Sequence, residues 1–295
     1  MNSFQEVLVK ARQKGPVELA VVKPYDTATM LAVKEGVKEQ IIRAELFGDR
    51  TLILPLLEKA GLSEREVVVS HDSEGALEHA VVSVREGRNK MLLKGNIHTP
   101  ELLHTALGKS SGLGTGKICS HVLVNEISGF GRLLLITDGG LNILPDLGQK
   151  IEIIKNAVAL AHSLEIKLPK VALLASMEDI SVKLPATTDA AILTQMAHRG
   201  VFTDAIVDGP LAIDNILSPE AALIKSIKSE VSGQADIIVV PGVEVGNVLG
   251  KIIGYFVKTI SAGIVLGAKA PIILPSRSGS TESKLASIAL GVLQL

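Results

Sequence analysis

Residues 132–176 read RLLLITDGGLNILPDLGQKIEIIKNAVALAHSLEIKLPKVALLAS, with two short aliphatic runs on either side of a longer amphipathic segment. Its short aliphatic runs at 132–137 and 170–176 predict two strands. The amphipathic segment 146–166 between them predicts a helix with Asp146 as its N-cap. A strand, a helix and a second strand in this order predict two parallel strands joined by a helical crossover.

The same alternation runs along the rest of the chain. Further aliphatic runs bounded by Gly, Pro or Asp predict strands, and longer amphipathic segments lie between most of them. The additional predicted strands cover 18–22, 66–70, 91–94, 204–208, 235–241, 262–268 and 270–276. Because strands alternate with helices from end to end, we expect an α/β protein with mostly parallel sheets.

The composition fits this fold and excludes several classes of function. The chain has 295 residues, of which 47% are hydrophobic but only 2% aromatic, with two Tyr, five Phe and no Trp. Its core must therefore be aliphatic, which suits the strands of a buried parallel sheet. The rings are too few for a surface that stacks single-stranded nucleic acid. A net charge of -1 also argues against a non-specific nucleic-acid binder, which is normally basic.

Cysteine, histidine and charge patterns exclude further classes. The single cysteine, Cys119, rules out an internal disulfide and a site with several thiolate ligands. The seven histidines lack the paired spacings of zinc sites, so no metal is predicted. Charges interrupt residues 1–15, and no apolar run approaches the ~18 residues of a membrane span. We therefore expect a cytoplasmic protein that binds neither nucleic acid nor membrane.

A second domain is predicted to begin near residue 116. The segment GKSSGLGTGK, residues 108–117, interrupts the strand–helix pattern with glycine and small hydroxyl residues. Two aliphatic runs, 121–127 and 132–137, follow with only SGFG between them, which predicts an antiparallel hairpin. A hairpin of this kind inside an α/β chain often marks the start of a domain.

The most informative pattern for a site is SRSGS, residues 276–280. A predicted strand ends in this turn, and the last predicted helix begins from it. Helix N-termini carry unpaired N–H groups and a partial positive charge, which together bind anions. The serines add hydroxyl groups, and Arg277 can hold two phosphate oxygens at once. The pattern fits a phosphate site, but serines that only cap the helix and a solvated arginine would explain it equally well.

Polar residues follow other predicted strands in the same way. Lys94 and Gly95 stand at the end of the predicted strand 91–94, and Asp138 and Asn142 lie in the loop after 132–137. Because ligands of α/β proteins bind outside the carboxyl ends of parallel strands, these residues predict a single crevice. The alternative is that the polar groups of the loop only satisfy its own backbone.

Four blocks, in order over about two hundred residues from Lys90 onward, resemble the phosphate acyltransferases, the family of phosphate acetyl- and butyryltransferases. The resemblance is closest to the butyryl or branched-chain branch. The blocks are LLKGNIHT with GLGTGKICSHV, RLLLITDGGLNILPDLGQKIEIIKNAVALAHSLEIKLPKVALLA, PATTDAA with IVDGPLAIDN, and GQADIIVVPGVEVGNVLGKIIGYF with APIILPSRSGSTESKLASIAL.

The resemblance implies reversible transfer of an acyl group between coenzyme A (CoA) and inorganic phosphate, by direct attack in a ternary complex. CoA is then a substrate, and no permanently bound cofactor is expected. The resemblance also implies a homo-oligomer and a two-domain, three-layer αβα fold similar to isocitrate and isopropylmalate dehydrogenases. The domains would be 1–115 plus 266–295 and 116–265, with the active-site cleft between them.

Matched position by position, Ser276 and Arg277 correspond to the catalytic Ser–Arg pair of this family. The resemblance implies that Arg277 binds phosphate and that Ser276 stabilises the oxyanion or the leaving thiolate. Further substrate contacts are expected from Lys94, Gly95, Asp138, Asn142, Ser278 and Ser280.

Two positions depart from the acetyltransferase pattern. Ser283 replaces an aspartate implicated as the base for the thiol, and His104 replaces an arginine in the helix that matches PELLHTAL. Both departures favour the longer-acyl branch and leave the base unidentified, with His104 and Glu282 as candidates. Three alternatives stay open: an acetyl-specific enzyme, a metal- and NAD-dependent decarboxylating dehydrogenase of similar fold, and a non-catalytic protein that binds acyl-CoA or phosphate.

Overall fold

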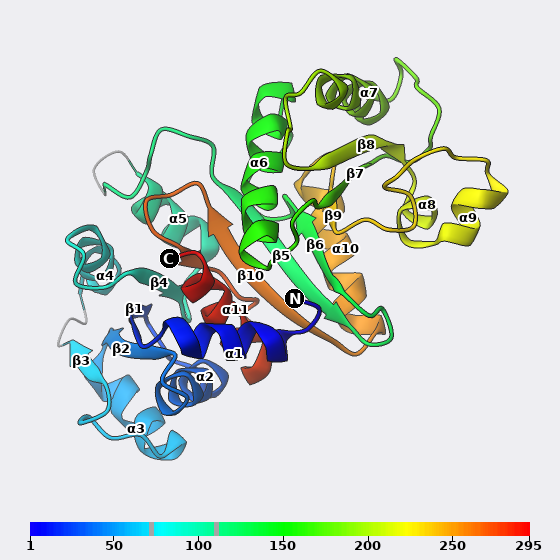
Figure 1. Cartoon of the computed structure of the whole chain (residues 1–295). Coiled ribbons are helices and arrows are strands. Elements are labelled where there is room, and N and C mark those ends of the chain that lie inside the picture. The colour runs from blue at the N-terminus through cyan, green and yellow to red at the C-terminus, as the bar shows by residue number, and fades with distance from the viewer. Residues whose placement is uncertain (71–73, 109–111) are drawn as a thin grey trace. The chain divides into compact units, whose positions relative to one another are not determined.

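The computed structural model describes residues 1–70, 74–108 and 112–295 (Figure 1). The chain forms two compact units. Residues 3–117 and 260–295 make up the first, which we call the terminal unit. Residues 118–259, together with Met1 and Asn2, make up the second, the central unit.

The terminal unit contains strands in the order β3-β2-β1-β4-β11-β10. Neighbouring strands are parallel, except that β10 runs antiparallel to β11. Helix α11 packs against both α1 and α2, and α4 packs against α5 and β1 (Figure 1). The strands are β1 Val17–Val22, β2 Ile42–Phe47, β3 Val68–Ser70, β4 Met91–Lys94, β10 Thr259–Leu266 and β11 Ile272–Ile273. The helices are α1 Phe4–Lys14, α2 Thr27–Lys38, α3 Arg50–Ala60, α4 Ala76–Arg85, α5 Thr99–Leu107 and α11 Thr281–Leu293.

The central unit contains strands in the order β5-β6-β9-β7-β8. The predicted hairpin is confirmed, because β5 pairs antiparallel with β6, whereas the other neighbouring strands are parallel. The strands are β5 Ser120–Ile127, β6 Leu133–Thr137, β7 Lys170–Leu174, β8 Ile206–Leu211 and β9 Ile237–Val239. The helices are α6 Leu147–Ser163, α7 Pro185–His198, α8 Ile213–Leu217, α9 Pro219–Ile224 and α10 Val243–Phe256.

The strand–helix–strand prediction for residues 132–176 is confirmed by β6, α6 and β7. Helix α6 begins after Asp146, whose carboxylate accepts a hydrogen bond from the backbone N–H of Gln149 at 2.8 Å. The Gln149 side chain accepts one in return from the Asp146 N–H at 2.9 Å, which completes a capping box. The strands β6 and β7 are parallel, with β9 paired between them. The expected α/β class with mostly parallel strands is therefore confirmed.

The two units divide between Lys117 and Ile118 and again between Thr259 and Ile260. The second division differs from the boundary expected between 265 and 266, which falls inside β10. The reason is that β10 pairs with β11, so almost the whole strand belongs to the terminal unit. Residues 109–111 of the Gly/Ser-rich segment lie outside the described residues. Within the described chain, no helix is both long and apolar enough to cross a membrane.

Candidate active site

The candidate site lies where β4 and β11 end in the terminal unit. These strands are parallel neighbours, with Leu92 opposite Ile272 and Leu93 opposite Ile273. Lys94 is the last residue of β4, and three residues beyond β11 the chain enters the turn 276–280. The register therefore brings Lys94 and this turn to the same edge of the sheet, as the sequence predicted for strand-end residues.

The turn 276–280 leads directly into α11. The Oγ atoms of Ser276 and Ser278 lie 3.1 Å apart, and the Gly279 N–H donates to the Ser276 carbonyl at 3.0 Å. Ser280 is the N-cap, since its Oγ accepts from the Ser283 N–H at 3.2 Å. The sequence left open that the serines of this turn only cap the helix, and Ser280 does cap it. Ser276 and Ser278 are exposed and bonded to each other.

Arg277 keeps much of its hydrogen-bonding capacity for a ligand. Its Nη2 donates to the Ile97 carbonyl at 3.3 Å and lies 3.5 Å from His98 Nδ1. Within the described part of the chain, Nε and Nη1 have no hydrogen-bond partner. The side chain is exposed, and a guanidinium carries five N–H donors in a planar fork. One edge is thus anchored to the loop after β4, while the remaining donors can hold phosphate oxygens bidentately.

Two buried lysines lie beside this arginine. Lys284, in the first turn of α11, is 2% exposed, and its Nζ donates to Thr29 Oγ1 at 2.9 Å and lies 3.4 Å from Asp26 Oδ1. Lys94 is 4% exposed. Burial of Asp26 opposes its ionisation, but the hydrogen bonds from Thr29 and the charge of Lys284 outweigh burial and lower its pKa.

The positive charge of this cluster is only partly compensated. Burial lowers the pKa of Lys94, and the charges of Arg277 and Lys284 lower it further, while Asp26 acts in the opposite direction. Lys94 thus interacts with two other basic side chains, Arg277 and Lys284, and with a single carboxylate, Asp26. Such an excess of positive charge in a half-buried setting attracts an anion with several oxygens.

Gly95 has a structural role that the sequence did not reveal. A Cβ atom at this position would lie 2.3 Å from the Val22 carbonyl oxygen and 2.4 Å from that of Lys23. The Gly95 N–H donates to the Val22 carbonyl at 2.9 Å. The absence of a side chain therefore lets the end of β4 lie against the end of β1, and this explains the glycine without a substrate contact.

Asp138 and Asn142 belong to the central unit, where their polar groups serve their own loop. The Asp138 carboxylate is 2% exposed and accepts from the N–H groups of Gly140 and Leu141, each at 2.9 Å. It also accepts from the Asn142 amide at 2.6 Å, and that amide donates to the Cys119 carbonyl at 2.9 Å. These contacts favour the alternative in which the two residues hold the loop.

The two candidates for the thiol base are both exposed. His104 lies in the last turn of α5, and Glu282 lies in the first turn of α11. Hydrogen bonds from its own backbone and from Ser280 lower the pKa of Glu282, which makes it a weaker base. Ser283 is 8% exposed and its Oγ accepts from the Ser261 N–H at 3.2 Å, so it is committed to packing.

Sequence reasoning missed Lys284 and its partners Asp26 and Thr29. The signal that could have found them is the single lysine of α11, which interrupts a run of small and aliphatic residues that is otherwise almost wholly buried. A lysine in such a helix needs a partner, because an unpaired charge is costly to bury.

Among the described residues, no group of three or more His, Cys, Asp or Glu could hold a metal ion.

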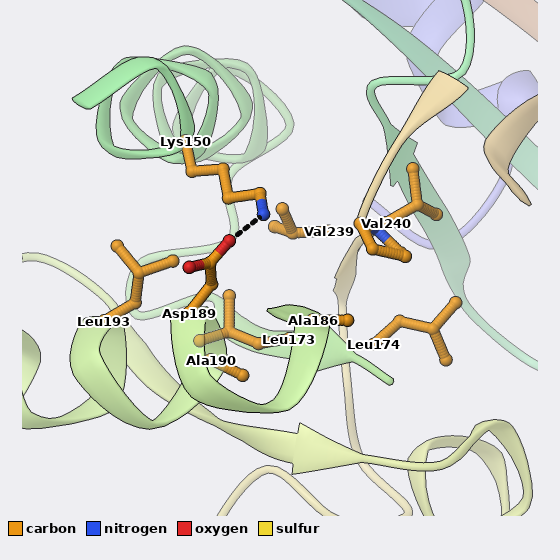
Figure 2. A pocket seen from close by; sticks show the side chains of 10 residues that line it. Lys150, Leu173, Leu174, Ala186, Asp189, Ala190, Leu193, Val239 and Val240 are labelled. Carbon is orange, nitrogen blue, oxygen red and sulfur yellow. Dashed lines mark hydrogen bonds and ion pairs between the residues drawn. The ribbon is translucent and has the colours of Figure 1, made fainter. Parts of the chain in front are cut away.

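A separate hollow lies inside the central unit, beside the carboxyl ends of β7 and β9 (Figure 2). It has about 240 Å³ of empty space, part of which is open to solvent. Lys150 of α6 and Asp189 of α7 meet across it, with Nζ 2.6 Å from Oδ2. The rest of the lining is aliphatic and comprises Leu173, Leu174, Ala186, Ala190, Leu193, Val239, Val240 and Pro241.

Lys150→Met should lower the free energy of unfolding of the central unit by about 2–4 kcal/mol, because the Asp189 carboxylate would lose its partner in a largely apolar setting. The lysine side chain is 7% exposed and the aspartate 25%, so water only partly compensates. Urea unfolding measures the change. The double variant Lys150→Met/Asp189→Leu should recover most of the loss, and Lys155→Met, an exposed change on the same helix, should have little effect. Additive effects of the two single changes would contradict a coupled pair.

An anion-binding cluster at strand ends, beside a helix N-terminus, is typical of α/β enzymes that act on phosphate or phosphorylated ligands. Comparison with known proteins identifies the class more closely. Residues 56–292 match the model of the family described as "Phosphate acetyl/butaryl transferase". The chain belongs to this family of acyltransferases, which confirms the resemblance noted from the sequence.

Individual relatives cover nearly the whole chain. The phosphate butyryltransferase of Clostridium acetobutylicum is 40% identical over 295 residues, which is 99% of this chain and 98% of that protein. The phosphate acetyltransferase of Rhizobium meliloti is 37% identical over 99% of this chain and 93% of its own. The crystal structure of a branched-chain phosphotransacylase from Enterococcus faecalis has a TM-score of 0.83 and 33% identity, and the match covers 94% of this chain and 98% of that one.

Proposed function

We propose that the protein transfers a butyryl or branched-chain acyl group reversibly between CoA and inorganic phosphate. The observation that carries this proposal is Arg277, anchored to the loop after β4 by one nitrogen, with unpartnered donors and two buried lysines nearby. A dianion with several oxygens is the ligand this arrangement fits best. Of the residues expected to bind substrate, Lys94, Ser276, Arg277, Ser278 and Ser280 lie together at this edge.

The reaction proceeds by direct attack in a ternary complex. Arg277 holds phosphate so that one oxygen faces the thioester carbonyl, and positioning of this kind lowers a barrier by roughly 7–11 kcal/mol in favourable cases. Ser276, exposed beside the arginine, donates its hydroxyl to the carbonyl oxygen as charge develops there. Loss of one such donor typically costs about 3–4 kcal/mol of transition-state stabilisation.

The preference for a longer acyl group rests on the relatives and on two residues. The Clostridium relative is named a phosphate butyryltransferase and the Enterococcus structure a branched-chain phosphotransacylase. Ser283 and His104 stand where the acetyltransferase pattern has charged residues. The alternative is an acetyl-specific enzyme, since the Rhizobium relative is named a phosphate acetyltransferase.

Phosphate-dependent release of free thiol from acyl-CoA tests the proposal in one assay. We expect kcat/KM for butyryl-CoA and isobutyryl-CoA to exceed that for acetyl-CoA by about tenfold or more, since each added methylene in an apolar site contributes ~1 kcal/mol or more. A higher value for acetyl-CoA would assign the acetyl-specific alternative. Thiol release that does not depend on phosphate would overturn the proposal.

The dehydrogenase alternative has its own test. It requires turnover that depends on NAD and a divalent metal, and we expect none with hydroxy-acid substrates of that class. The alternative of a non-catalytic binding protein predicts that CoA or phosphate binds without any release of thiol. Homo-oligomerisation and a cytoplasmic location, both expected from the sequence, stay predictions.

A further inference from the structure

The proposed reaction leaves one proton without a carrier. Inorganic phosphate binds as HPO4 2- and the acyl phosphate leaves as a dianion, so the P–O–H proton must leave the phosphate during the transfer. The C–S bond then breaks, and the CoA thiolate takes up a proton to leave as a thiol. The group that moves this proton must accept it and then release it, and it must lie beside the bound phosphate. This step rests on the proposed function.

The candidates named from the sequence do not meet these requirements. His104 and Glu282 are exposed, and Glu282 is further weakened by the hydrogen bonds it accepts. Ser283 occupies the position of the acetyltransferase aspartate, but its oxygen is held by the Ser261 N–H. Arg277 does not release its protons at physiological pH.

Lys94 has the required properties. It ends β4 beside the turn that carries Ser276 and Arg277, and it is 4% exposed. Within the described residues its Nζ has no hydrogen-bond or ion-pair partner, whereas the other buried lysine of the cluster, Lys284, is held by Thr29 and Asp26. A largely buried lysine whose amine has no partner among the described residues, next to a site for phosphate, is free to bond to the ligand.

We propose that the neutral amine of Lys94 accepts the proton of the attacking phosphate and then passes it to the leaving CoA thiolate. In the first step the O–H bond of phosphate breaks and the amine becomes an ammonium, while a C–O bond forms to the acyl carbon and the C=O π pair moves onto the carbonyl oxygen. In the second step the C=O bond re-forms, the C–S bond breaks and the ammonium gives its proton to sulfur. The amine is restored, and the products are acyl phosphate and CoA thiol. The reverse reaction follows the same path backwards.

The surrounding charges support a neutral amine. Burial opposes a charge on Lys94 most strongly, the charges of Arg277 and Lys284 oppose it further, and Asp26 acts in the opposite direction. Asp26 is already engaged by Thr29 and Lys284. The pKa of Lys94 is therefore lowered from its ordinary value. The carrier role predicts that kcat rises with pH as this amine loses its proton.

Lys94→Met and Lys94→Arg separate proton transfer from simple attraction of phosphate. We expect both variants to lose about 100-fold or more in kcat, with the KM for phosphate changed less than tenfold in Lys94→Arg, because arginine still donates hydrogen bonds to phosphate but does not release its proton. Both variants should also lose the acid limb of the kcat–pH profile. The control is Lys90→Met, an exposed lysine just before β4, which should behave as wild type.

A second variant keeps the proposal testable if arginine does not fit. Lys94→Cys, in a Cys119→Ser background, is alkylated with bromoethylamine to give thialysine, whose amine is less basic than that of lysine. This enzyme should regain activity, with its acid limb moved to lower pH. Full kcat in Lys94→Arg, or a regained activity whose acid limb does not move, would overturn the proton-carrier role. Wild-type protein without phosphate-dependent thiol release would instead overturn the proposed function.

Discussion

Arg277→Ala should remove saturation by phosphate and lower kcat/KM for phosphate by about 10²–10⁴-fold. The guanidinium has donors without partners at the strand-end site, and each hydrogen bond to a charged ligand contributes ~1.5–3 kcal/mol. Two such bonds lost together correspond to ~3–6 kcal/mol, and each 1.4 kcal/mol is a tenfold change. Initial rates over a range of phosphate concentrations at fixed butyryl-CoA measure the effect.

The fold should tolerate this change. The side chain is exposed, and among the described residues its hydrogen bonds are to Ile97 and His98, so stability should change by no more than about 0.5 kcal/mol. Arg277→Lys should fall between wild type and alanine, because a lysine keeps the charge but not the two-pronged geometry. Arg88→Ala, at an exposed arginine of the same unit, is the control. Saturation by phosphate at the wild-type KM in Arg277→Ala would contradict the assignment.

The parts of the fold that the sequence predicted are those decided by local patterns. The run 132–176 predicted β6, α6 and β7 because aliphatic strands and an amphipathic helix differ in period, and because Asp146 and Gln149 form their capping box within one turn. The sheet order was not predictable in this way. Residues 262–268 and 270–276 both read as strands, but their pattern does not show that β10 and β11 run antiparallel.

The candidate site divides along the same line. Ser276 and Arg277 were predicted because a strand that ends in a Ser/Arg turn before a helix is a local signal. The contact between Lys284 and Thr29 joins residues 255 positions apart, so no short pattern contains it. Asp138 and Asn142 satisfied the same strand-end rule as Arg277, yet their hydrogen bonds close their own loop. The rule identifies where a ligand can bind, but not which polar groups are already occupied.

Gly95→Ala should destabilise the terminal unit by about 4 kcal/mol or more, because a severe steric overlap in the core is among the few causes of so large a loss. The new Cβ would lie 2.3 Å from the Val22 oxygen and 2.4 Å from the Lys23 oxygen, both of them backbone atoms. Val22 pairs with Phe47 on one side and Lys94 on the other, so β1 has no free direction in which to move. With about 2–4 °C per kcal/mol for a unit of this size, the melting temperature should fall by roughly 10 °C.

Gly254→Ala is the matched control for this prediction. A Cβ on Gly254 meets nothing within 4 Å, and the residue lies inside α10, so alanine should stabilise that helix by up to about 1 kcal/mol. Scanning calorimetry of the whole chain resolves the two changes. A melting temperature of Gly95→Ala within 2 °C of wild type would show that the ends of β1 and β4 can separate. If the ends of β1 and β4 cannot separate, Gly95 holds Lys94 in place beside Arg277. The folded fraction of Gly95→Ala should then also lose activity.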